Sequence, residues 1–173
     1  ALKYGNIEWD KLVRIHIDFF HIIKKKIKKI LDEYKFIYEL DAHLTSPNEL
    51  KDTMFDRVIQ FGNRFSLTYD LNDIMMIRIV NPWTKNLEEM CKILKKHKDL
   101  NLFSEKVVDK KIFHLIGKTT LGTTYEIKLW PTTIHHWAQW QKINKIKNTD
   151  NMKSFYDKTL KLQHLIDNDI HIR

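Results

Sequence analysis

Hydrophobic positions in the first part of the chain recur at steps of three and four residues, which is typical of a helix with one buried face. The repeat extends over residues 9–36. Its members are Trp9, Leu12, Val13, Phe20, Ile23, Ile27, Ile30, Leu31 and Tyr34. The lysines of this segment, which fall mostly on the other side, are Lys24, Lys25, Lys26, Lys28 and Lys29. We therefore expect a long N-terminal helix with one apolar and one basic face.

A second helix is predicted to begin at residues 46–49. Ser46 suits the N-cap, Pro47 suits the first helical position, and Glu49 completes a capping box. The apolar face of this helix would carry Leu50, Met54, Val58 and Phe61. Gly62 followed by Asn63 is a plausible left-handed stop.

The remaining pattern alternates between short apolar runs and helical repeats. Residues 73–80 are almost continuously apolar and predict a buried strand. Further strands are expected over residues 112–116 and 124–130, joined by a turn over 117–122, and helices over 84–97, from 132 onwards, and over 152–166. This order predicts an α/β or α+β domain in which helices cover a small sheet.

Composition narrows the class of protein. The 173 residues, with 43% hydrophobic and 12% aromatic residues, are enough for a core, and they predict a single domain over 1–173 with a C-terminal helix over about 150–167. The one cysteine, Cys91, excludes an internal disulfide framework and lies in an apolar helical stripe, so we expect it in the core. No run of about 18 apolar residues exists, so we expect no membrane partner and a cytoplasmic, reducing compartment.

Charge adds a hint about partners. The chain has 30 Lys+Arg against 22 Asp+Glu, a formal net charge of +8, which favours a polyanionic partner such as RNA, DNA or nucleotide phosphates. The predicted RNA-binding residues are Lys24, Lys25, Lys28 and Lys29. The same lysines also fit a helix face that is simply solvated.

The sequence contains no Gly-rich phosphate loop and no H-E-x-x-H, C-x-x-C or G-x-S-x-G motif. Two acidic residues are nevertheless candidates for a catalytic or metal-binding role. Asp73 lies at the beginning of the predicted apolar strand, where an unpaired carboxylate would be costly to bury. Glu126 lies inside a predicted strand, and alternation sends it to the same side as Lys128 and Trp130. Carboxylates on neighbouring strands can hold Mg²⁺, with nucleotide phosphates completing the shell. Alternatively, Glu126 and Lys128 form a solvent-facing pair.

Three segments resemble RelA/SpoT-type (p)ppGpp synthetases. Residues 70–80, DLNDIMMIRIV, resemble the D-I-x-D-x-x-(G/A)-I-R-(I/V) strand of that family. Residues 125–130, YEIKLW, with 134–139, IHHWAQ, resemble its V-E-I-Q-I-R-T…M-H…A-E segment. Residues 44–50, which follow a long Trp-led helix, are similar to its R-x-K-S-x-x-S-(I/L) stretch. Order and spacing agree over about 9–148, which we take as the core of the domain.

The resemblance implies a mixed sheet flanked by helices, of nucleotidyltransferase-like type. Enzymes of this family move pyrophosphate from ATP to a ribose 3′-hydroxyl, on GTP or GDP in the alarmone synthetases and on the tRNA 3′ end in related toxins. By position, Asp73 resembles the Asp that binds Mg²⁺, and Glu126 resembles the Glu that helps bind the metal or activates the acceptor hydroxyl. Arg78 and His135 also match family positions, which implies substrate binding.

The chain departs from the family pattern at several positions. His43 and Thr45 stand where the family has an Arg and a Lys that clamp the ATP phosphates, and Trp130 replaces an Arg. The G-Y-x-S-x-H loop, whose Tyr stacks on the acceptor base, has no counterpart in residues 110–124. Candidate substitutes for these missing charges are Lys51, Arg57 or Arg64. Lys128 is a further residue that we predict to bind substrate.

Two functions follow from these observations. The first is a divergent pyrophosphotransferase that uses Mg²⁺, Asp73 and Glu126 to act from ATP on a nucleotide or on an RNA 3′-hydroxyl. The second is an inactive RelA/SpoT-like fold that serves as a basic RNA-binding module or docks to a protein partner in a larger assembly. Such a module would use the lysines and the tryptophans Trp130, Trp137 and Trp140, because stacking and backbone neutralisation need no catalytic shell.

Overall fold

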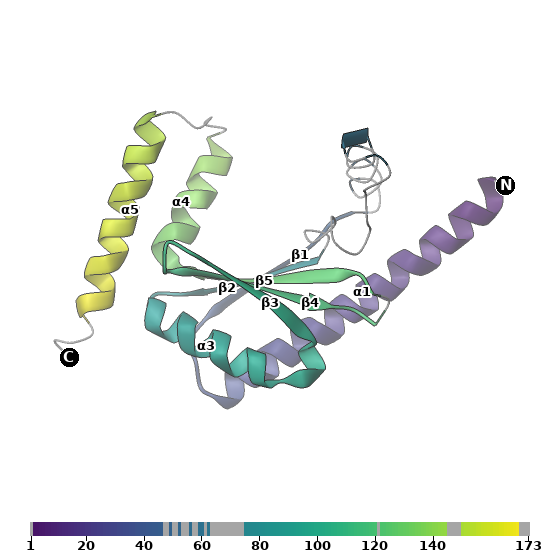
Figure 1. Cartoon of the computed structure of the whole chain (residues 1–173), viewed down its shortest axis with the longest axis horizontal. Coiled ribbons are helices and arrows are strands. Elements are labelled where there is room, and N and C mark those ends of the chain that lie inside the picture. Colours follow the sequence, from purple (N-terminus) through teal and green to yellow (C-terminus); the bar gives the residue numbers. More distant parts are fainter. Residues whose placement is uncertain are drawn as a thin grey trace.

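Within the described part of the chain, five strands form one mixed sheet with helices on both sides (Figure 1). The computed structural model describes residues 2–46, 49, 52, 56, 59, 60, 62, 75–120, 122–144 and 150–169. The helices are α1 Leu2–Glu33, α3 Thr84–Lys96, α4 Thr132–Ile143 and α5 Asp150–Asp169, with a 3-10 turn η2 at Lys98–Leu100. The strands are β1 Glu39–Leu44, β2 Met75–Asn81, β3 Leu102–Val108, β4 Ile112–Lys118 and β5 Thr124–Pro131. This α+β architecture confirms the predicted fold class.

The strand order is β1-β2-β5-β4-β3, and the centre of the sheet is a parallel pair. Strands β2 and β5 run parallel, whereas β1–β2, β4–β5 and β3–β4 are antiparallel. Asn81 at the end of β2 lies beside Pro131 at the end of β5. Helices α3 and α4, which follow these two strands, therefore begin at the same edge of the sheet, where open α/β sheets place their ligands.

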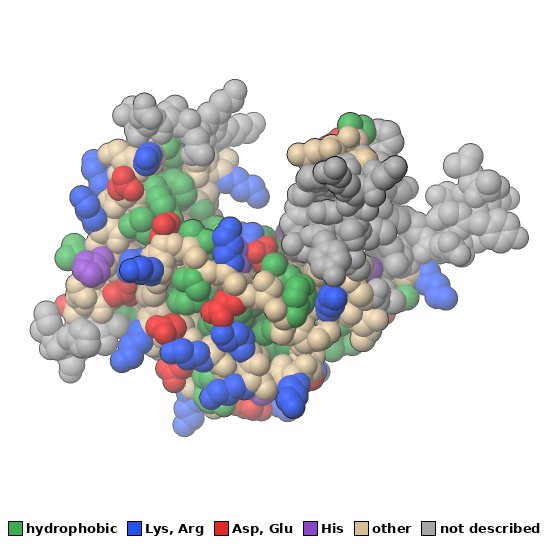
Figure 2. Space-filling view, in the orientation of Figure 1, with side chains coloured by type: hydrophobic (Ala, Val, Ile, Leu, Met, Phe, Trp, Pro, Cys, Tyr) green, Lys and Arg blue, Asp and Glu red, His purple; other side chains and the backbone are tan. Residues whose placement is uncertain are grey.

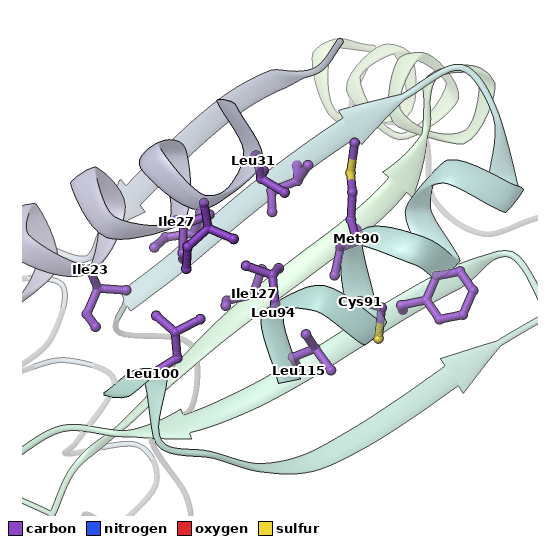
Figure 3. Packing of buried hydrophobic residues seen from close by; sticks show 14 of the residues in the cluster. Ile23, Ile27, Leu31, Met90, Cys91, Leu94, Leu100, Leu115 and Ile127 are labelled. Carbon is purple, nitrogen blue, oxygen red and sulfur yellow. The ribbon is translucent and has the colours of Figure 1, made fainter. Parts of the chain in front are cut away.

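The core lies between the sheet and the two helices α1 and α3, which run along the same face of the sheet (Figure 1). In β5, Tyr125, Ile127 and Leu129 point into this core and are fully buried. Ile27 and Leu31 of α1 and Leu94 of α3 meet the strands there (Figure 3). Full burial of each aliphatic side chain contributes about 1.5–3 kcal/mol, so this layer fixes which way every strand faces. Cys91 is buried in the same cluster, as predicted.

Helix α1 carries the predicted apolar stripe. Its buried members are Phe20, Ile23, Ile27, Ile30 and Leu31, whereas the side chains of Trp9, Leu12 and Val13 lie outside the described residues. The prediction that Tyr34 belongs to the stripe is wrong, because the helix ends at Glu33 and Tyr34 is 53% exposed. The left-handed backbone of Lys35, at φ 58°, turns the chain before the stripe can continue. Neither α1 nor any other helix in the described ranges is long and apolar enough to span a membrane.

The two edge strands, β1 and β3, are absent from the sequence prediction. Strand β3 is mostly exposed, and its residues Phe103 and Val107 face solvent. Strand β1 alternates exposed charged residues such as Glu39 and Asp41 with partly buried Leu40. An edge strand has one neighbour and needs little apolar surface, so its hydrophobic pattern is too weak to predict it.

Gly117 was predicted to begin a turn, but it lies inside β4. It pairs directly with Tyr125 of β5, and a Cβ at this position would overlap the Tyr125 ring. The hydroxyl of Tyr125 donates a hydrogen bond to the backbone carbonyl of Leu100, which holds the ring over Gly117. The chain reverses later, where the N–H of Thr119 donates to the carbonyl of Thr123 at 2.8 Å. Gly117 therefore makes room for a ring, and the turn prediction is wrong at this residue.

The predicted capping box at residues 46–49 is confirmed. The N–H of Ser46 donates to Oε2 of Glu49 at 3.0 Å, and the N–H of Glu49 donates to Oγ of Ser46 at 3.3 Å. These hydrogen bonds from Ser46 lower the pKa of the Glu49 carboxyl. The apolar positions predicted for the rest of this helix, Leu50, Met54, Val58 and Phe61, lie outside the described residues.

Asp167 ties α5 to the body of the domain. Its carboxylate accepts hydrogen bonds from the N–H and Oγ1 of Thr84, at 2.9 and 2.8 Å, and from Nε2 of Gln163 at 3.0 Å. Nζ of Lys111, between β3 and β4, lies 2.7 Å away. Burial alone would raise the pKa of Asp167, but the hydrogen bonds from Lys111 and Thr84 outweigh burial and lower it. One carboxylate thus joins α5, the start of α3 and the β3–β4 connection.

Candidate active site on the polar face of the sheet

The face of the sheet turned away from α1 and α3 carries charged and aromatic side chains, and we call it the polar face. It comprises Asp41 of β1, Arg78 of β2, His114 of β4 and Glu126, Lys128 and Trp130 of β5. The strand register places Asp41 beside Arg78, Arg78 beside Lys128, and Lys128 beside His114. Because adjacent strands are about 4.8 Å apart, these side chains form a continuous row. The prediction that Glu126, Lys128 and Trp130 share one side of a strand is confirmed.

Glu126 is a partly buried carboxylate held between a histidine and a lysine side chain. Nδ1 of His114 lies 2.9 Å from its Oε1, and Nζ of Lys128 lies 3.3 Å from its Oε2. The Glu126 side chain is only 13% exposed. Burial raises the pKa of Glu126, but the hydrogen bond from His114 and the charge of Lys128 act against burial, and the net direction is down. The carboxylate is therefore ionised and fixed in place at neutral pH.

Arg78 lies opposite Lys128 in the parallel strand pair and contacts an aromatic ring. Its guanidinium carbon is 4.9 Å from the ring centroid of Trp130, a cation–π contact. Nη1 of Arg78 is also 3.8 Å from Oδ2 of Asp41. The Trp130 ring in turn stacks near His114, with centroids 6.5 Å apart and planes at 21°. The Trp that replaces a family Arg at position 130 thus becomes a neighbour of Arg78.

Helix α4 adds a histidine to the same region. It begins at Thr132, directly after β5, so His135 comes close to the sheet edge and is buried. Burial lowers the pKa of His135, and the positive charge of Arg78 lowers it further. His135 is therefore mostly neutral at pH 7 and can offer one ring N–H as a donor.

Several buried side-chain nitrogens in or near this region have no hydrogen-bond partner among the described residues. They are Nε of Arg78, Nε1 of Trp130, Nδ1 of His135 and Nε1 of Trp137. A buried polar group without a partner costs about 1–3 kcal/mol. Trp130 and His135 lie near the end of β5 and the start of α4, and Arg78 of β2 contacts Trp130, whereas Trp137 lies further along α4 and packs against α5. Such a group of donors suits a ligand that is rich in acceptors, as a phosphate chain is.

The structure brings some of the predicted site residues together. Glu126, Lys128, Arg78 and His135 lie on or beside the polar face, and their predicted roles stay predictions. The predicted RNA-binding residues Lys24, Lys25, Lys28 and Lys29 are on α1, which packs on the other face of the sheet. Asp73, Lys51, Arg57 and Arg64 lie outside the described residues, so their predicted roles also stay predictions.

The sequence did not single out His114 or Asp41. The strand prediction over residues 112–116 contained His114, and the same alternation that oriented Glu126 would have oriented it. Its contact with Glu126 nevertheless depends on the β4–β5 register, which the sequence pattern does not reveal. Asp41 was missed because β1 itself was not predicted.

The three tryptophans do not form one cluster. Trp137 of α4 packs against Tyr156 of α5, with ring centroids 4.8 Å apart. Trp140 stacks on Phe155 of α5 at 5.7 Å. Only Trp130 belongs to the polar face, so Trp137 and Trp140 serve the contact between α4 and α5.

The described residues supply only part of a magnesium site. Among them, no group of three or more His, Cys, Asp or Glu side chains could hold a metal ion. Glu126 offers hard carboxylate oxygens, each of which keeps a lone pair beyond its contact with His114 or Lys128. This donor is compatible with Mg²⁺, and the second predicted ligand, Asp73, lies outside the described residues.

Comparison by sequence finds no relative. No protein-family model matches the chain, and no curated protein matches it either.

Comparison by structure, in contrast, identifies the fold. A GTP pyrophosphokinase family protein from Streptococcus pneumoniae superposes with a TM-score of 0.69 at 19% identity, over 95% of this chain and 91% of that one. Small alarmone synthetase 2 from Bacillus subtilis gives 0.69 at 16% identity, over 94% and 97%. Small alarmone synthetase 1 from the same organism gives 0.68 at 14% identity, over 95% and 94%.

The chain therefore has the RelA/SpoT-like fold of the small alarmone synthetases, as its motifs suggested. Small alarmone synthetase 1 from Bacillus subtilis has also been solved with AMPCPP and with its product pppGpp. At these levels of identity the likeness establishes the fold.

Proposed function

We propose that the polar face binds ATP and that the domain transfers the pyrophosphoryl group of ATP to a ribose hydroxyl, on a nucleotide or at an RNA 3′ end. The observation that carries this proposal is the ionised carboxylate of Glu126, fixed between His114 and Lys128 on the polar face, with Arg78 opposite Lys128 on the neighbouring strand. Phosphoryl chemistry needs charge neutralisation on the phosphates and a carboxylate near the attacking hydroxyl. The fold neighbour solved with AMPCPP and with pppGpp supports the same substrate class.

The reaction balances with the groups at hand. The acceptor hydroxyl oxygen forms a bond to the β-phosphorus of ATP, and the bond from that phosphorus to the oxygen bridging to the α-phosphorus breaks. AMP leaves with the bonding electron pair. The hydroxyl proton passes to a carboxylate oxygen of Glu126, which is ionised because its pKa is lowered. Lys128 and Arg78 neutralise charge on the transferred group, and the unpartnered donors of Trp130 and His135 bind phosphate oxygens.

The magnesium part of the proposal rests on Glu126 together with Asp73. In the sequence Asp73 comes three residues before Met76, and Met76 is the β2 residue that pairs with Glu126. A bound Mg²⁺ would neutralise charge on the ATP phosphates.

Label transfer tests the function directly. The protein is incubated with γ-labelled ATP and Mg²⁺, and with GDP, GTP or bulk tRNA as acceptor. We expect label on one of these acceptors with the unchanged protein and at least a hundredfold less with Glu126→Gln, which keeps the shape and removes the base. Glu88→Gln is the matched control, because Glu88 is exposed on α3 and forms an ion pair with Lys92, away from the polar face. Transfer by the unchanged protein that Glu126→Gln leaves intact would contradict the role of Glu126.

One observation favours the alternative of an inactive module. Both oxygens of Glu126 already contact a basic side chain, and His43, at a position where the family clamps ATP, is exposed on β1. If the folded protein transfers no label to any of these acceptors, the proposed transferase is wrong and the inactive module remains.

A further inference from the structure

The lysines of α1 differ in how they are paired. Nζ of Lys26 lies 2.5 Å from Oδ2 of Asp99, so this lysine serves the contact with η2. Nζ of Lys29 lies 3.9 Å from Oε1 of Glu33. Within the residues that the structure describes, Lys24, Lys25 and Lys28 have no acidic partner, and all three are exposed. Three ammonium groups thus remain available for an anion on this part of the helix.

A cavity of about 530 Å³ opens beside these lysines at the end of α1. Its lining residues are Lys24, Lys28, Asp32, Phe36, Ile37, Tyr38 and Leu40. The cavity exists because the chain turns back after α1, where the N–H of Phe36 donates to the carbonyl of Leu31 at 3.2 Å. Its volume lies in the range of small-molecule sites, which is roughly 300–1,000 Å³.

A hydrogen-bond network fixes one wall of this cavity. The Tyr38 hydroxyl donates to Oδ1 of Asp32 at 2.7 Å and is 3.3 Å from the backbone carbonyl of Lys28. Burial, the hydrogen bond to Asp32 and its charge together raise the pKa of Tyr38, so the hydroxyl stays protonated. The cavity therefore combines apolar lining residues with the carboxylate of Asp32 and the ammonium groups of Lys24 and Lys28.

One of the residues that line the cavity, Phe36, belongs to an aromatic pair. The rings of Tyr34 and Phe36 stack with centroids 6.4 Å apart and planes at 23°. Tyr34 is 53% exposed, and the neighbouring Ile37 is 76% exposed. Exposed rings beside a row of lysines are the arrangement by which proteins bind single-stranded nucleic acid, since bases stack while ammonium groups neutralise phosphates.

We infer that this surface, comprising Lys24, Lys25, Lys28, Tyr34 and the cavity, binds single-stranded RNA, with one base in the cavity and the phosphates on the lysines. The Asp32 carboxylate supplies an acceptor for a ribose 2′-hydroxyl, which favours RNA over DNA. Exposed Lys11 and Arg14 extend the positive charge along α1, about 26 Å from Lys11 to Lys28. The net charge alone would not locate this site, because basic and acidic side chains are mixed over the face in Figure 2.

The surface is separate from the candidate active site. It is formed by α1 and the segment that leads into β1, whereas Glu126 is on the polar face, on the other side of the sheet from α1. RNA binding here therefore goes beyond the proposed transferase and does not depend on it.

The test is a titration of a fluorescently labelled 12-nucleotide single-stranded RNA, followed by anisotropy at several salt concentrations. We expect the triple variant Lys24→Ala/Lys25→Ala/Lys28→Ala to weaken binding at least tenfold. It should also reduce the slope of log K against log salt by about 2, because each lost phosphate contact on a single strand lowers the slope by about 0.7. The matched control is Lys96→Ala/Lys153→Ala/Lys158→Ala, which removes the same charge from exposed positions on α3 and α5 and should change binding less than twofold.

Stacking is tested by a second pair of variants that leave the charge unchanged. Tyr34→Ala should weaken binding at least fivefold, whereas Tyr34→Phe should retain it, and both should keep the melting temperature because Tyr34 is exposed. Equal loss in the two triple variants, or equal affinity for the Tyr34 variants, would overturn the proposal. Binding of single-stranded DNA as tight as that of RNA, or competition by free GMP at RNA-like concentrations, would also overturn it. None of these readouts uses transfer activity, so a failed transferase leaves the test intact.

Discussion

His114 on β4 and Glu126 on β5 meet through a 2.9 Å contact between Nδ1 and Oε1. The two residues are diagonal neighbours across the strand pair, because His114 lies directly opposite Lys128. Lys128 approaches the other carboxylate oxygen, so Glu126 is held from two sides. This arrangement positions the carboxylate before any ligand binds. Because the contacts form on folding, they should make the free energy of unfolding depend on the ionisation of Glu126.

Protonation of Glu126 at low pH should lower the free energy of unfolding. Its pKa is lowered on folding, so its contribution is fully present above the unfolded value near 4.5 and is lost as the pH falls through the lower folded value. Chemical unfolding from pH 6 to pH 3 should therefore show a smaller pH dependence in Glu126→Gln than in the unchanged protein. Identical slopes in the two proteins would contradict the charge-assisted contacts.

Asp167 should matter for the stability of the domain more than its position near the chain end suggests. Asp167→Asn removes the charge that Lys111 and Thr84 share, and it should lower the free energy of unfolding by about 2–3 kcal/mol. Asp157→Asn, on the same helix but exposed, should change it by less than about 0.5 kcal/mol. Urea unfolding measures both, and equal values for the two variants would show that the Asp167 contacts do not anchor α5.

Any side chain at position 117 should lower the stability of the protein. Gly117→Ala places a methyl group into the Tyr125 ring, and it should cost about 1–3 kcal/mol of stability. The double variant Gly117→Ala/Tyr125→Leu removes the ring, so it should be more stable than the sum of the two single changes predicts. Additive effects in thermal or urea unfolding would mean that the ring does not meet the added methyl group.

A strand can be predicted from the sequence when one of its faces is apolar and the other is polar. In β5, fully buried Ile127 and Leu129 alternate with polar Glu126 and Lys128, so the orientation of the candidate catalytic carboxylate was predictable. In β3 there is little buried surface, and the strand leaves no pattern to detect.

The partners of each site residue were harder to predict than the residues themselves. The contact of His114 with Glu126 and that of Arg78 with Trp130 both join separate strands, and strand order and register arise from the whole sheet. The cavity beside Lys28 likewise depends on the left-handed turn at Lys35, which no hydrophobic repeat marks. Local patterns thus predicted faces, while contacts between elements required the fold.

The position of the label in ATP tests the central claim most directly. Three samples of ATP, labelled at the α-, β- or γ-phosphate, are incubated with the protein, Mg²⁺ and the same acceptors, and the products are separated by chromatography. Pyrophosphate transfer predicts that β and γ label reach the acceptor in equal amounts while all α label appears in AMP. Transfer of γ label alone, α label on the acceptor, or no transfer to any acceptor would contradict it.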